Sequence, residues 1–199
     1  IKIGITGSIG TGKTTIGNML KIFNIPVFNS DKIVGKILKS NESVKKQINK
    51  IWPGVLIKKQ NVIDKNKLRK IIFANTECKK KLEKIIHPLV ENERIIFTGN
   101  HKKRKILAFD VPLLYEKKQQ KKYDYIFLAS CSYSLQKIRV LKRVGMDESI
   151  FMKINETQIS TSDKIKMKPI VIKTDKLKVL TFIDIMIIIF RIKFKIYIH

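Results

Sequence analysis

Cysteine is scarce in this chain of 199 residues, and no segment has the character of an export signal. The two cysteines, Cys78 and Cys131, are too few for a disulfide-stapled secreted scaffold, and neither belongs to a CxxC or Cys/His cluster that would hold zinc. The first residues lack a charged leader, a long apolar run and a small-residue cleavage site, so we expect a cytoplasmic location. With 44% hydrophobic and 29% charged residues, the composition is that of a folded globular domain.

Acidic residues are also few, and the charge balance is strongly basic. Lysine and arginine total 42 against 16 acidic residues, which gives a formal net charge of +26. The cations are mostly lysine and are dispersed along the chain, as expected from an A+T-rich genome, and aromatic residues are not interleaved with them as a platform for single-stranded nucleic acid requires. We therefore expect no nucleic-acid partner, although the positive electrostatic potential of so basic a chain would attract small polyanionic substrates.

No apolar run reaches the length of a membrane span. The longest candidate, residues 177–190, falls short of the roughly 18 to 20 residues that a bilayer requires and is interrupted by Asp184. This favours a buried terminal helix over a membrane anchor, and we expect no membrane span.

The remaining pattern alternates short β-branched runs with helical periodicity, which predicts an α/β fold with a central parallel sheet flanked by helices. Strands are expected at residues 2–6, 25–28, 106–109, 125–129 and 170–172. Residues 41–101 read as an all-helical insertion that is broken at Pro53-Gly54 and at Pro88. Helices are also expected at residues 14–23, 134–143, 146–165 and 177–190, and one is expected to begin near Ser30 or Asp31, either of which could be its cap.

The most informative motif is GSIGTGKT, which lies between the first strand and the first helix and matches the phosphate-loop pattern GxxxxGK[ST] in full. Glycines in such a loop allow backbone N–H groups to converge on a phosphate, and the following helix adds the positive end of its dipole. Lys13 would then reach the outer phosphates of ATP, and Thr14 would offer its hydroxyl to Mg²⁺. The predicted ATP-binding residues are Gly7, Ser8, Ile9, Gly10, Thr11, Gly12, Lys13, Thr14 and Thr15.

A phosphate loop occurs in both small-molecule kinases and GTPases. The NKxD motif by which a GTPase reads its base is absent from this sequence, which favours a kinase. The chain resembles the dephospho-coenzyme A kinases, members of the P-loop kinase fold that transfer the γ-phosphate of ATP to the ribose 3′-hydroxyl of dephospho-coenzyme A in the last step of coenzyme A synthesis. The resemblance runs from Ile3 to about Ile172. It is carried by the phosphate loop, Asn29-Ser30-Asp31, LRKIIF at 68–73, His87-Pro88, the segment DVPLLYE at 110–116, and Gln136, Arg139, Arg143 and Gln158.

The resemblance implies roles for particular residues. Asp31 would act as the general base or orient the acceptor hydroxyl, and Lys13, Arg139 and Arg143 would stabilise the transferring phosphoryl group. The two arginines lie four residues apart and would share a helix face. Asp110 would join Thr14 in holding Mg²⁺. Acceptor binding would involve Asp31, His87, Pro112, Leu113, Leu114 and Glu116.

We expect a single P-loop kinase domain whose core comprises about residues 1–40, 104–135 and 166–199. The helical acceptor-binding region would cover about residues 41–103 and the lid about residues 136–165. Asn29, Lys65, Lys168, Pro169 and Thr174 depart from the residues that the family commonly has. The alternatives are another nucleoside or nucleotide kinase of this fold, a basic nucleic-acid-binding protein with a relic phosphate loop, and an inactive kinase.

Overall fold

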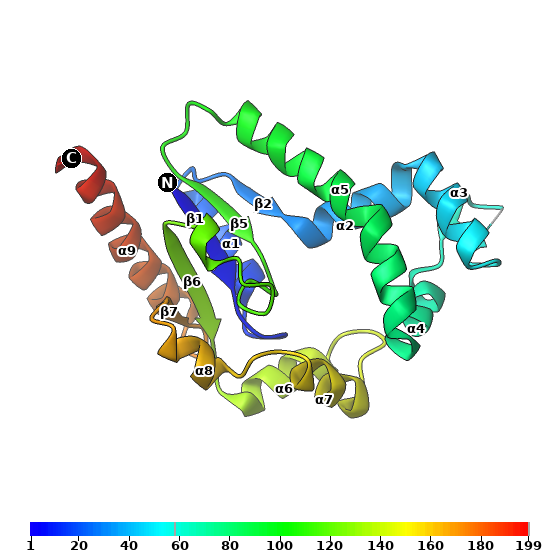
Figure 1. Cartoon of the computed structure of the whole chain (residues 1–199). Coiled ribbons are helices and arrows are strands. Elements are labelled where there is room, and N and C mark those ends of the chain that lie inside the picture. The colour runs from blue at the N-terminus through cyan, green and yellow to red at the C-terminus, as the bar shows by residue number, and fades with distance from the viewer. Residues whose placement is uncertain (58, 199) are drawn as a thin grey trace. The chain divides into compact units, whose positions relative to one another are not determined.

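The computed structural model describes residues 1–57 and 59–198, which form two compact units. The first unit comprises Ile1–Phe28 together with His101–His199, and the second comprises Asn29–Asn100. The chain thus leaves the first unit near the end of its second strand and returns to it before the third. Figure 1 shows the elements of both units.

A five-stranded sheet forms the centre of the first unit, with strand order β2-β5-β1-β6-β7. β1 pairs in parallel with β5 and with β6, and β6 pairs in parallel with β7. The predicted parallel sheet of an α/β fold is therefore confirmed. The strands are β1 (Lys2–Thr6), β2 (Val27–Asn29), β5 (Leu107–Asp110), β6 (Tyr125–Ser130) and β7 (Ile170–Lys173).

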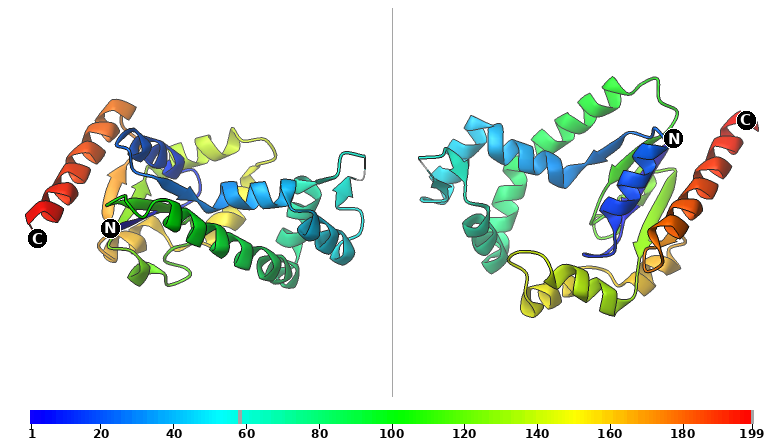
Figure 2. Two further views of the ribbon diagram at one scale, coloured as in Figure 1. Left: turned by 90° about the horizontal axis from the view of Figure 1, so that it is seen from above. Right: turned by 180° about the vertical axis from the view of Figure 1, so that it is seen from behind.

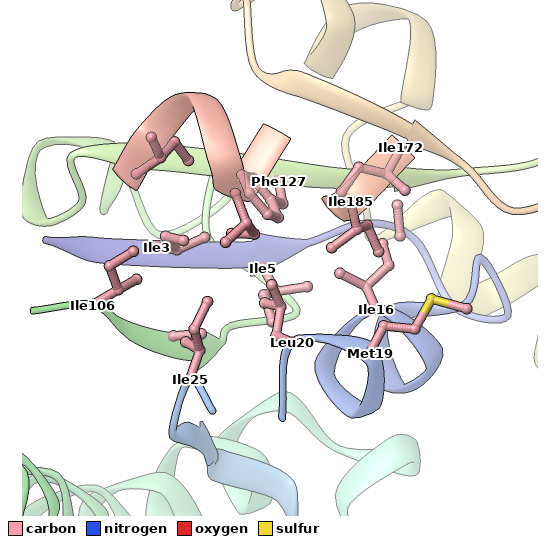
Figure 3. Packing of buried hydrophobic residues seen from close by; sticks show 14 residues of the cluster. Ile3, Ile5, Ile16, Met19, Leu20, Ile25, Ile106, Phe127, Ile172 and Ile185 are labelled. Carbon is pink, nitrogen blue, oxygen red and sulfur yellow. The ribbon is translucent and has the colours of Figure 1, made fainter. Parts of the chain in front are cut away.

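Helices pack on the sheet because their apolar faces bury against its isoleucine-rich strands. α1 and α9 lie on the same face, as Figure 2 shows from behind, and enclose the cluster drawn in Figure 3. Ile3, Ile5, Ile16, Phe127 and Ile185 in this cluster are fully buried. The helices of this unit are α1 (Lys13–Ile22), η1 (Gln120–Lys122), α6 (Tyr133–Leu141), α7 (Glu148–Glu156), α8 (Thr161–Lys166) and α9 (Lys178–Ile198).

The second unit has its own core, in which helices pack around Trp52, Ile48 and Leu68. Its elements are α2 (Ser30–Ser40), α3 (Glu42–Ile51), β3 (Leu56–Ile57), β4 (Val62–Ile63), α4 (Lys65–Ala74) and α5 (Thr76–Asn100). The expectation of an all-helical insertion was wrong, because β3 and β4 form a short antiparallel hairpin. Two-residue strands are too short to show the period-2 alternation by which a strand is identified in a sequence.

Several predicted boundaries were also wrong. α5 continues through Pro88, which was expected to break it, because the packing of α5 against α2 and α4 outweighs the hydrogen bond lost at the proline. α6 ends at Leu141 rather than Arg143, and the chain then turns, with the Met146 N–H donating to the Arg143 oxygen. The terminal helix α9 extends well beyond the predicted end at Phe190. Within the residues that the structure describes, no helix is long and apolar enough to cross a membrane.

Candidate active site

The phosphate loop leaves the carboxyl end of β1 and enters α1. Its backbone needs glycine at Gly7, where φ is +143° and a Cβ atom would lie 2.6 Å from the Ala129 oxygen. It also needs glycine at Gly12, which has φ of +94° and is the N-cap residue of α1, so that no side chain caps this helix. The first N–H groups of α1 are therefore not used by a capping side chain, which is the arrangement that binds an anion at a helix N-terminus.

The side chain of Lys13 folds back over this loop. Its ammonium nitrogen donates to the Gly7 oxygen at 2.6 Å and to the Ser8 oxygen at 2.9 Å. The Thr11 hydroxyl also donates to the Ser8 oxygen, at 2.8 Å, and is buried. These bonds fix the loop from within and keep the positive charge of Lys13 directly beside it, where it can meet a phosphate.

Two predicted magnesium ligands lie at the same edge of the sheet. Asp110 is the last residue of β5, which lies next to β1, and it pairs in register with Ile5, two residues before Gly7. Its side chain is largely buried, whereas Thr14 is exposed in the first turn of α1. Among the described residues, no group of three or more His, Cys, Asp or Glu side chains could hold a metal. A hydroxyl and one carboxylate fit Mg²⁺ instead, since Mg²⁺ keeps waters and takes further oxygens from phosphates.

A chain of hydrogen bonds connects α6 to the phosphate loop. Arg139 donates through Nη1 to the Thr174 hydroxyl at 2.9 Å and through Nη2 to the Thr174 backbone oxygen at 2.7 Å. The Thr174 hydroxyl in turn donates to the Thr11 oxygen at 2.8 Å. Thr174 is buried directly after β7, and its N–H donates to the Ser130 oxygen at 2.8 Å. The guanidinium of Arg139 is therefore held at the loop through one threonine.

Arg143 is placed differently from Arg139. It lies beyond the end of α6 and is exposed, so the two arginines do not share a helix face. The spacing of four residues predicted a shared face only on the assumption that α6 continued to Arg143. The structure brings Arg139 to the loop, while Arg143 stands in the turn that follows the helix.

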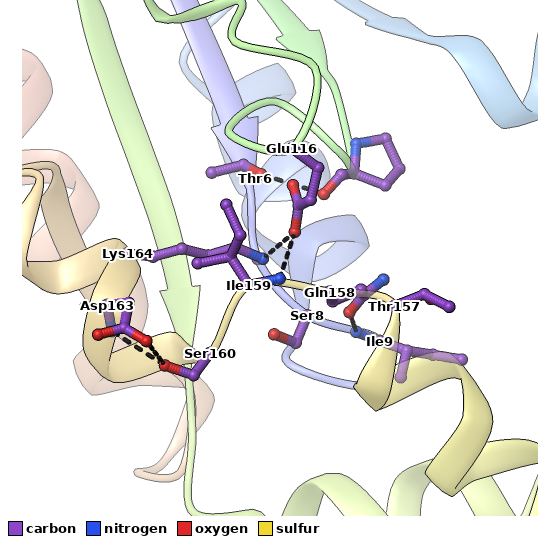
Figure 4. A network of polar contacts seen from close by, with 12 residues as sticks. Thr6, Ser8, Ile9, Glu116, Thr157, Gln158, Ile159, Ser160, Asp163 and Lys164 are labelled. Carbon is purple, nitrogen blue, oxygen red and sulfur yellow. Dashed lines mark hydrogen bonds and ion pairs between the residues drawn. The ribbon is translucent and has the colours of Figure 1, made fainter.

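The segment after α7 also contacts the loop. The Ile9 N–H donates to the side-chain oxygen of Gln158 at 3.1 Å, as Figure 4 shows. Gln136, which is buried in α6, donates to the Asn155 side chain at 3.1 Å and so joins α6 to α7. The predicted lid segment is thus bonded to the phosphate loop at one of its backbone amides.

The segment after β5 is tied to α8 by a buried ion pair. Lys164 is completely buried and its ammonium lies 2.9 Å from Oε1 of Glu116, which also accepts from the Ile159 N–H at 3.1 Å (Figure 4). The other carboxylate oxygen of Glu116 is buried with no hydrogen-bond partner among the described residues. Removing either charge would leave its partner buried and uncompensated.

The other predicted acceptor residues of this segment divide between the surface and the core. Pro112 and Leu113 are half-buried. Leu114 is fully buried against β1, where a Cβ atom on Gly4 would lie 2.7 Å from its Cδ1 atom. The Pro112 backbone oxygen accepts from the Thr6 hydroxyl at 3.2 Å, which fixes the turn beside the end of β1.

In the second unit, Asp31 lies in the first turn of α2 and is exposed. The cap of this helix is Asn29, whose side chain accepts from the Lys32 N–H at 2.8 Å, so the expectation that Ser30 or Asp31 could be the cap was wrong. Among the described residues, the Asp31 carboxylate forms no hydrogen bond or ion pair. A first-turn carboxylate is favoured there by the helix dipole and is available to a ligand. His87 is exposed in α5.

Titration shifts near the site have local causes. Burial raises the pKa of the Cys131 thiol, with the neighbouring positive charge of Arg139 acting in the opposite direction. The pKa of Asp147 is lowered, first by the hydrogen bond from the Ile150 N–H, because this carboxylate caps α7. The thiol is therefore protonated at neutral pH, and the cap carboxylate is ionised there.

Sequence reasoning missed the positions that support the site. The sequence marks Thr174 only as a departure from the asparagine that the family resemblance implies, and it does not single out Lys164. A buried lysine in a chain this rich in lysine has no signal of its own in the sequence. Thr174 could have been found from the rule that polar residues after parallel strands meet at one edge of the sheet.

Comparisons with known proteins identify the family of this chain. A family model described as dephospho-CoA kinase matches residues 1–178. The dephospho-CoA kinase of Bartonella quintana is 36% identical over 176 residues, covering 87% of this chain and 89% of that protein. The dephospho-CoA kinase of Fusobacterium nucleatum is 34% identical over 176 residues, with the same coverage of 87% and 89%.

Solved structures show the same fold. A Thermus thermophilus protein superposes with a TM-score of 0.80 at 21% identity, covering 97% of each chain. The dephospho-CoA kinase of Campylobacter jejuni superposes with a TM-score of 0.69 at 23% identity, covering 96% of each chain. The family model and the curated relatives show that the chain belongs to the dephospho-CoA kinase family, and its activity is that of an ATP-dependent phosphotransferase in the final step of coenzyme A synthesis.

Proposed function

We propose that this protein transfers the γ-phosphate of ATP to the ribose 3′-hydroxyl of dephospho-coenzyme A, with Mg²⁺ as the metal and with the site residues assigned below. The observation that carries the assignment is the bonded chain from Arg139 through Thr174 to Thr11. These hydrogen bonds hold a planar guanidinium beside a complete phosphate loop, from which it would stabilise the charge on the transferring phosphoryl oxygens.

The loop would bind the phosphates of ATP through the backbone amides of residues 7–15 and the N-terminus of α1. Lys13 now donates to two carbonyl oxygens of the loop and would exchange these bonds for phosphate oxygens, which are stronger acceptors. Because the loop is also bonded at Ile9 and Thr11, its shape is set before the nucleotide arrives. Preorganisation of this kind lowers the free energy needed to order the site during the reaction.

Mg²⁺ would be held by the Thr14 hydroxyl and by Asp110, and when bound it would neutralise charge on the β- and γ-phosphates. Asp110 is suited to this role because it is a largely buried carboxylate at the end of the strand next to β1.

Asp31 would accept a hydrogen bond from the acceptor hydroxyl and orient it for in-line attack. The cap of α2 is Asn29, so Asp31 is not needed for capping. In a loose phosphoryl-transfer transition state, orientation of the nucleophile contributes more than early removal of its proton. His87 would contact the acceptor nucleotide from its exposed position in α5.

The segment after β5 would shape the acceptor pocket. Pro112 and Leu113 are its accessible members, whereas Leu114 and Glu116 would act through packing and through the ion pair with Lys164. Residues 136–165 would close over ATP and exclude water, with Arg143 supplying a second positive charge from the turn after α6. The bond between Gln158 and Ile9 would couple this lid to the loop.

An acceptor panel with γ-labelled ATP tests the proposal. We expect the labelled phosphate to be transferred to dephospho-coenzyme A. A phosphatase specific for 3′-phosphates should then release the label from the product. Lys13→Ala should abolish transfer, whereas Lys121→Ala, which changes an exposed lysine of η1, should leave it unchanged. Efficient phosphorylation of a nucleoside monophosphate in place of dephospho-coenzyme A, or label resistant to the 3′-phosphatase, would refute it.

A further inference from the structure

The terminal helix α9 has two apolar faces, and among its described side chains one face is buried in the fold while the other is exposed. Ile185, Ile189 and Ile192 are buried against the sheet and α1. On the other side, residues exposed between 38% and 69% form what we call the α9 stripe. At about 100° per residue, the stripe falls within about one third of the helix circumference. Its members are Val179, Leu180, Ile183, Met186, Ile187, Phe190 and Phe194.

The α9 stripe is continuous and includes two aromatic rings. From Val179 to Phe194 it extends about 22 Å at about 1.5 Å per residue. The rings of Phe190 and Phe194 stack with centroids 6.3 Å apart, so they form one exposed apolar surface. The match to the kinase family model ends at residue 178, so the stripe lies outside the sequence that the model matches.

Cations border the stripe and line a pocket beside its carboxyl-terminal end. Lys193 and Arg191 stand on opposite borders of the stripe when α9 is drawn as a helical wheel. Lys193 also lines a pocket of about 270 Å³ together with Lys103, Arg104 and Lys105, over a floor that includes Ile25 and Ile106. No acidic side chain is among the described residues that line this pocket. We call it the basic pocket.

The basic pocket lies at the edge of the sheet opposite the phosphate loop. Ile25 and Ile106 precede β2 and β5, so the pocket stands at the amino ends of these strands, whereas the loop follows the carboxyl end of β1. Figure 1 shows the end of α9 on the same side of the first unit as the N-terminus. A large ligand at this edge would leave the phosphate loop accessible.

We propose that the α9 stripe and the basic pocket together dock this protein on the surface of an anionic phospholipid bilayer. The phenylalanines would enter the boundary between headgroups and acyl chains, and the basic pocket would take a lipid phosphate. An apolar helical ridge bordered by cations is the arrangement that lies in a membrane interface.

Charge complementarity selects this occupant over a second copy of the chain. Each chain carries a formal charge of +26, and a symmetric contact through the stripe would bring the bordering cations of two copies together. A bilayer instead offers anionic headgroups over an apolar interior, which meets both the cations and the stripe. A convex ridge can enter such an interface without a complementary groove.

Vesicle binding by the full-length chain tests the proposal. Vesicles with about 30% phosphatidylglycerol in phosphatidylcholine should bind the protein at least about tenfold more tightly than phosphatidylcholine alone. The double variant Phe190→Gln/Phe194→Gln should weaken binding at least about tenfold, because two large apolar side chains are removed from the interface. Its matched control, Ile95→Gln/Ile96→Gln, changes two exposed isoleucines of α5 and should stay within about twofold.

A second pair of variants distinguishes binding by the basic pocket from attraction by the overall charge of the protein. Lys103→Gln/Arg104→Gln and Lys121→Gln/Lys122→Gln remove the same charge from exposed positions. We expect the first to weaken vesicle binding at least about fivefold at low salt and the second less than about twofold. Equal effects would mean that only the overall charge attracts the protein, and the proposal would then be wrong.

Further measurements keep the test valid if a variant folds poorly. Kinase activity without vesicles should be unchanged in the phenylalanine variant. The fluorescence of Phe190→Trp should shift to the blue when anionic vesicles are added, and that of Ile95→Trp should not.

Two outcomes would assign the stripe to another occupant. If light scattering shows a dimer and Phe190→Gln/Phe194→Gln dissociates it, the stripe binds a second copy of the chain. Binding to polyglutamate with the same variant pattern, but not to vesicles, would assign it to an acidic protein. Either result would overturn the proposal.

Discussion

Replacing Thr174 by valine would remove a hydroxyl that joins Arg139 to the phosphate loop. This hydroxyl donates to the Thr11 oxygen at 2.8 Å and accepts from Nη1 of Arg139 at 2.9 Å. Valine has the same shape, so the core around β7 stays packed while both bonds are lost. The bond from Nη2 to the Thr174 backbone oxygen, at 2.7 Å, is retained.

The size of the effect follows from these bonds. A neutral hydrogen bond contributes about 0.5 to 1.5 kcal/mol and one to a charged group about 1.5 to 3 kcal/mol. Because one guanidinium bond remains, we expect a loss of about 1.5 to 3 kcal/mol of transition-state stabilisation, which is about 13- to 160-fold in kcat/KM. The effect should fall mainly on kcat, since Arg139 is proposed to act on charge that develops in the transition state.

The assay measures ADP formation with dephospho-coenzyme A as acceptor, at several ATP concentrations. Thr174→Ser keeps the hydroxyl and should stay within about threefold of the parent protein. An equal loss in both variants would point to the packing of the methyl group rather than to the hydroxyl. A well-folded Thr174→Val protein with full activity would refute the idea that Thr174 positions Arg139.

Three further predictions test the other parts of the site. Arg139→Lys should lower kcat at least about tenfold, because lysine cannot make the two parallel bonds, whereas the exposed Arg143 should tolerate lysine more readily in the same assay. Asp31→Asn should slow turnover by at least about tenfold with only a small drop in melting temperature, because Asn29 and not Asp31 caps α2 and the helix dipole contributes less than about 1 kcal/mol; a large drop in melting temperature would return Asp31 to a structural role. The pKa of Asp147 is lowered from its usual 3.8, so its contribution to α7 is complete above that value and is lost as the pH falls through the lower, folded-state pKa. Hydrogen exchange of α7 amides, corrected for intrinsic rates, should show this loss in the parent and not in Asp147→Asn.

The phosphate loop could be predicted from the sequence because all its determinants are local. The glycines, Lys13 and Thr14 lie within eight residues, and the strand before them and the helix after them have clear periodicity. Such a motif needs no knowledge of the remaining chain. The parallel sheet could be predicted for the same reason, since buried strands are continuous apolar runs.

The residues that support the loop could not be predicted in this way. The bond from Thr174 to Thr11 spans 163 residues in the sequence, and the one from Ile9 to Gln158 spans 149. These hydrogen bonds form because the fold packs the segments after β7 and α7 against the phosphate loop. No short sequence pattern specifies that packing. Arg143 illustrates the converse, because a correct helical spacing failed when the helix ended two residues early.

Thr174 also shows how threonine can serve at a position where the resemblance to the family implies asparagine. A single hydroxyl both accepts from Arg139 and donates to Thr11, which are the two functions that an amide would divide between its oxygen and nitrogen. The second bond of the guanidinium goes to the backbone, and the backbone is fixed by the bond from the Thr174 N–H to Ser130. Half of the arginine's anchorage is therefore independent of the side chain at this position. The requirement at residue 174 is a short group that can donate and accept, and threonine meets it.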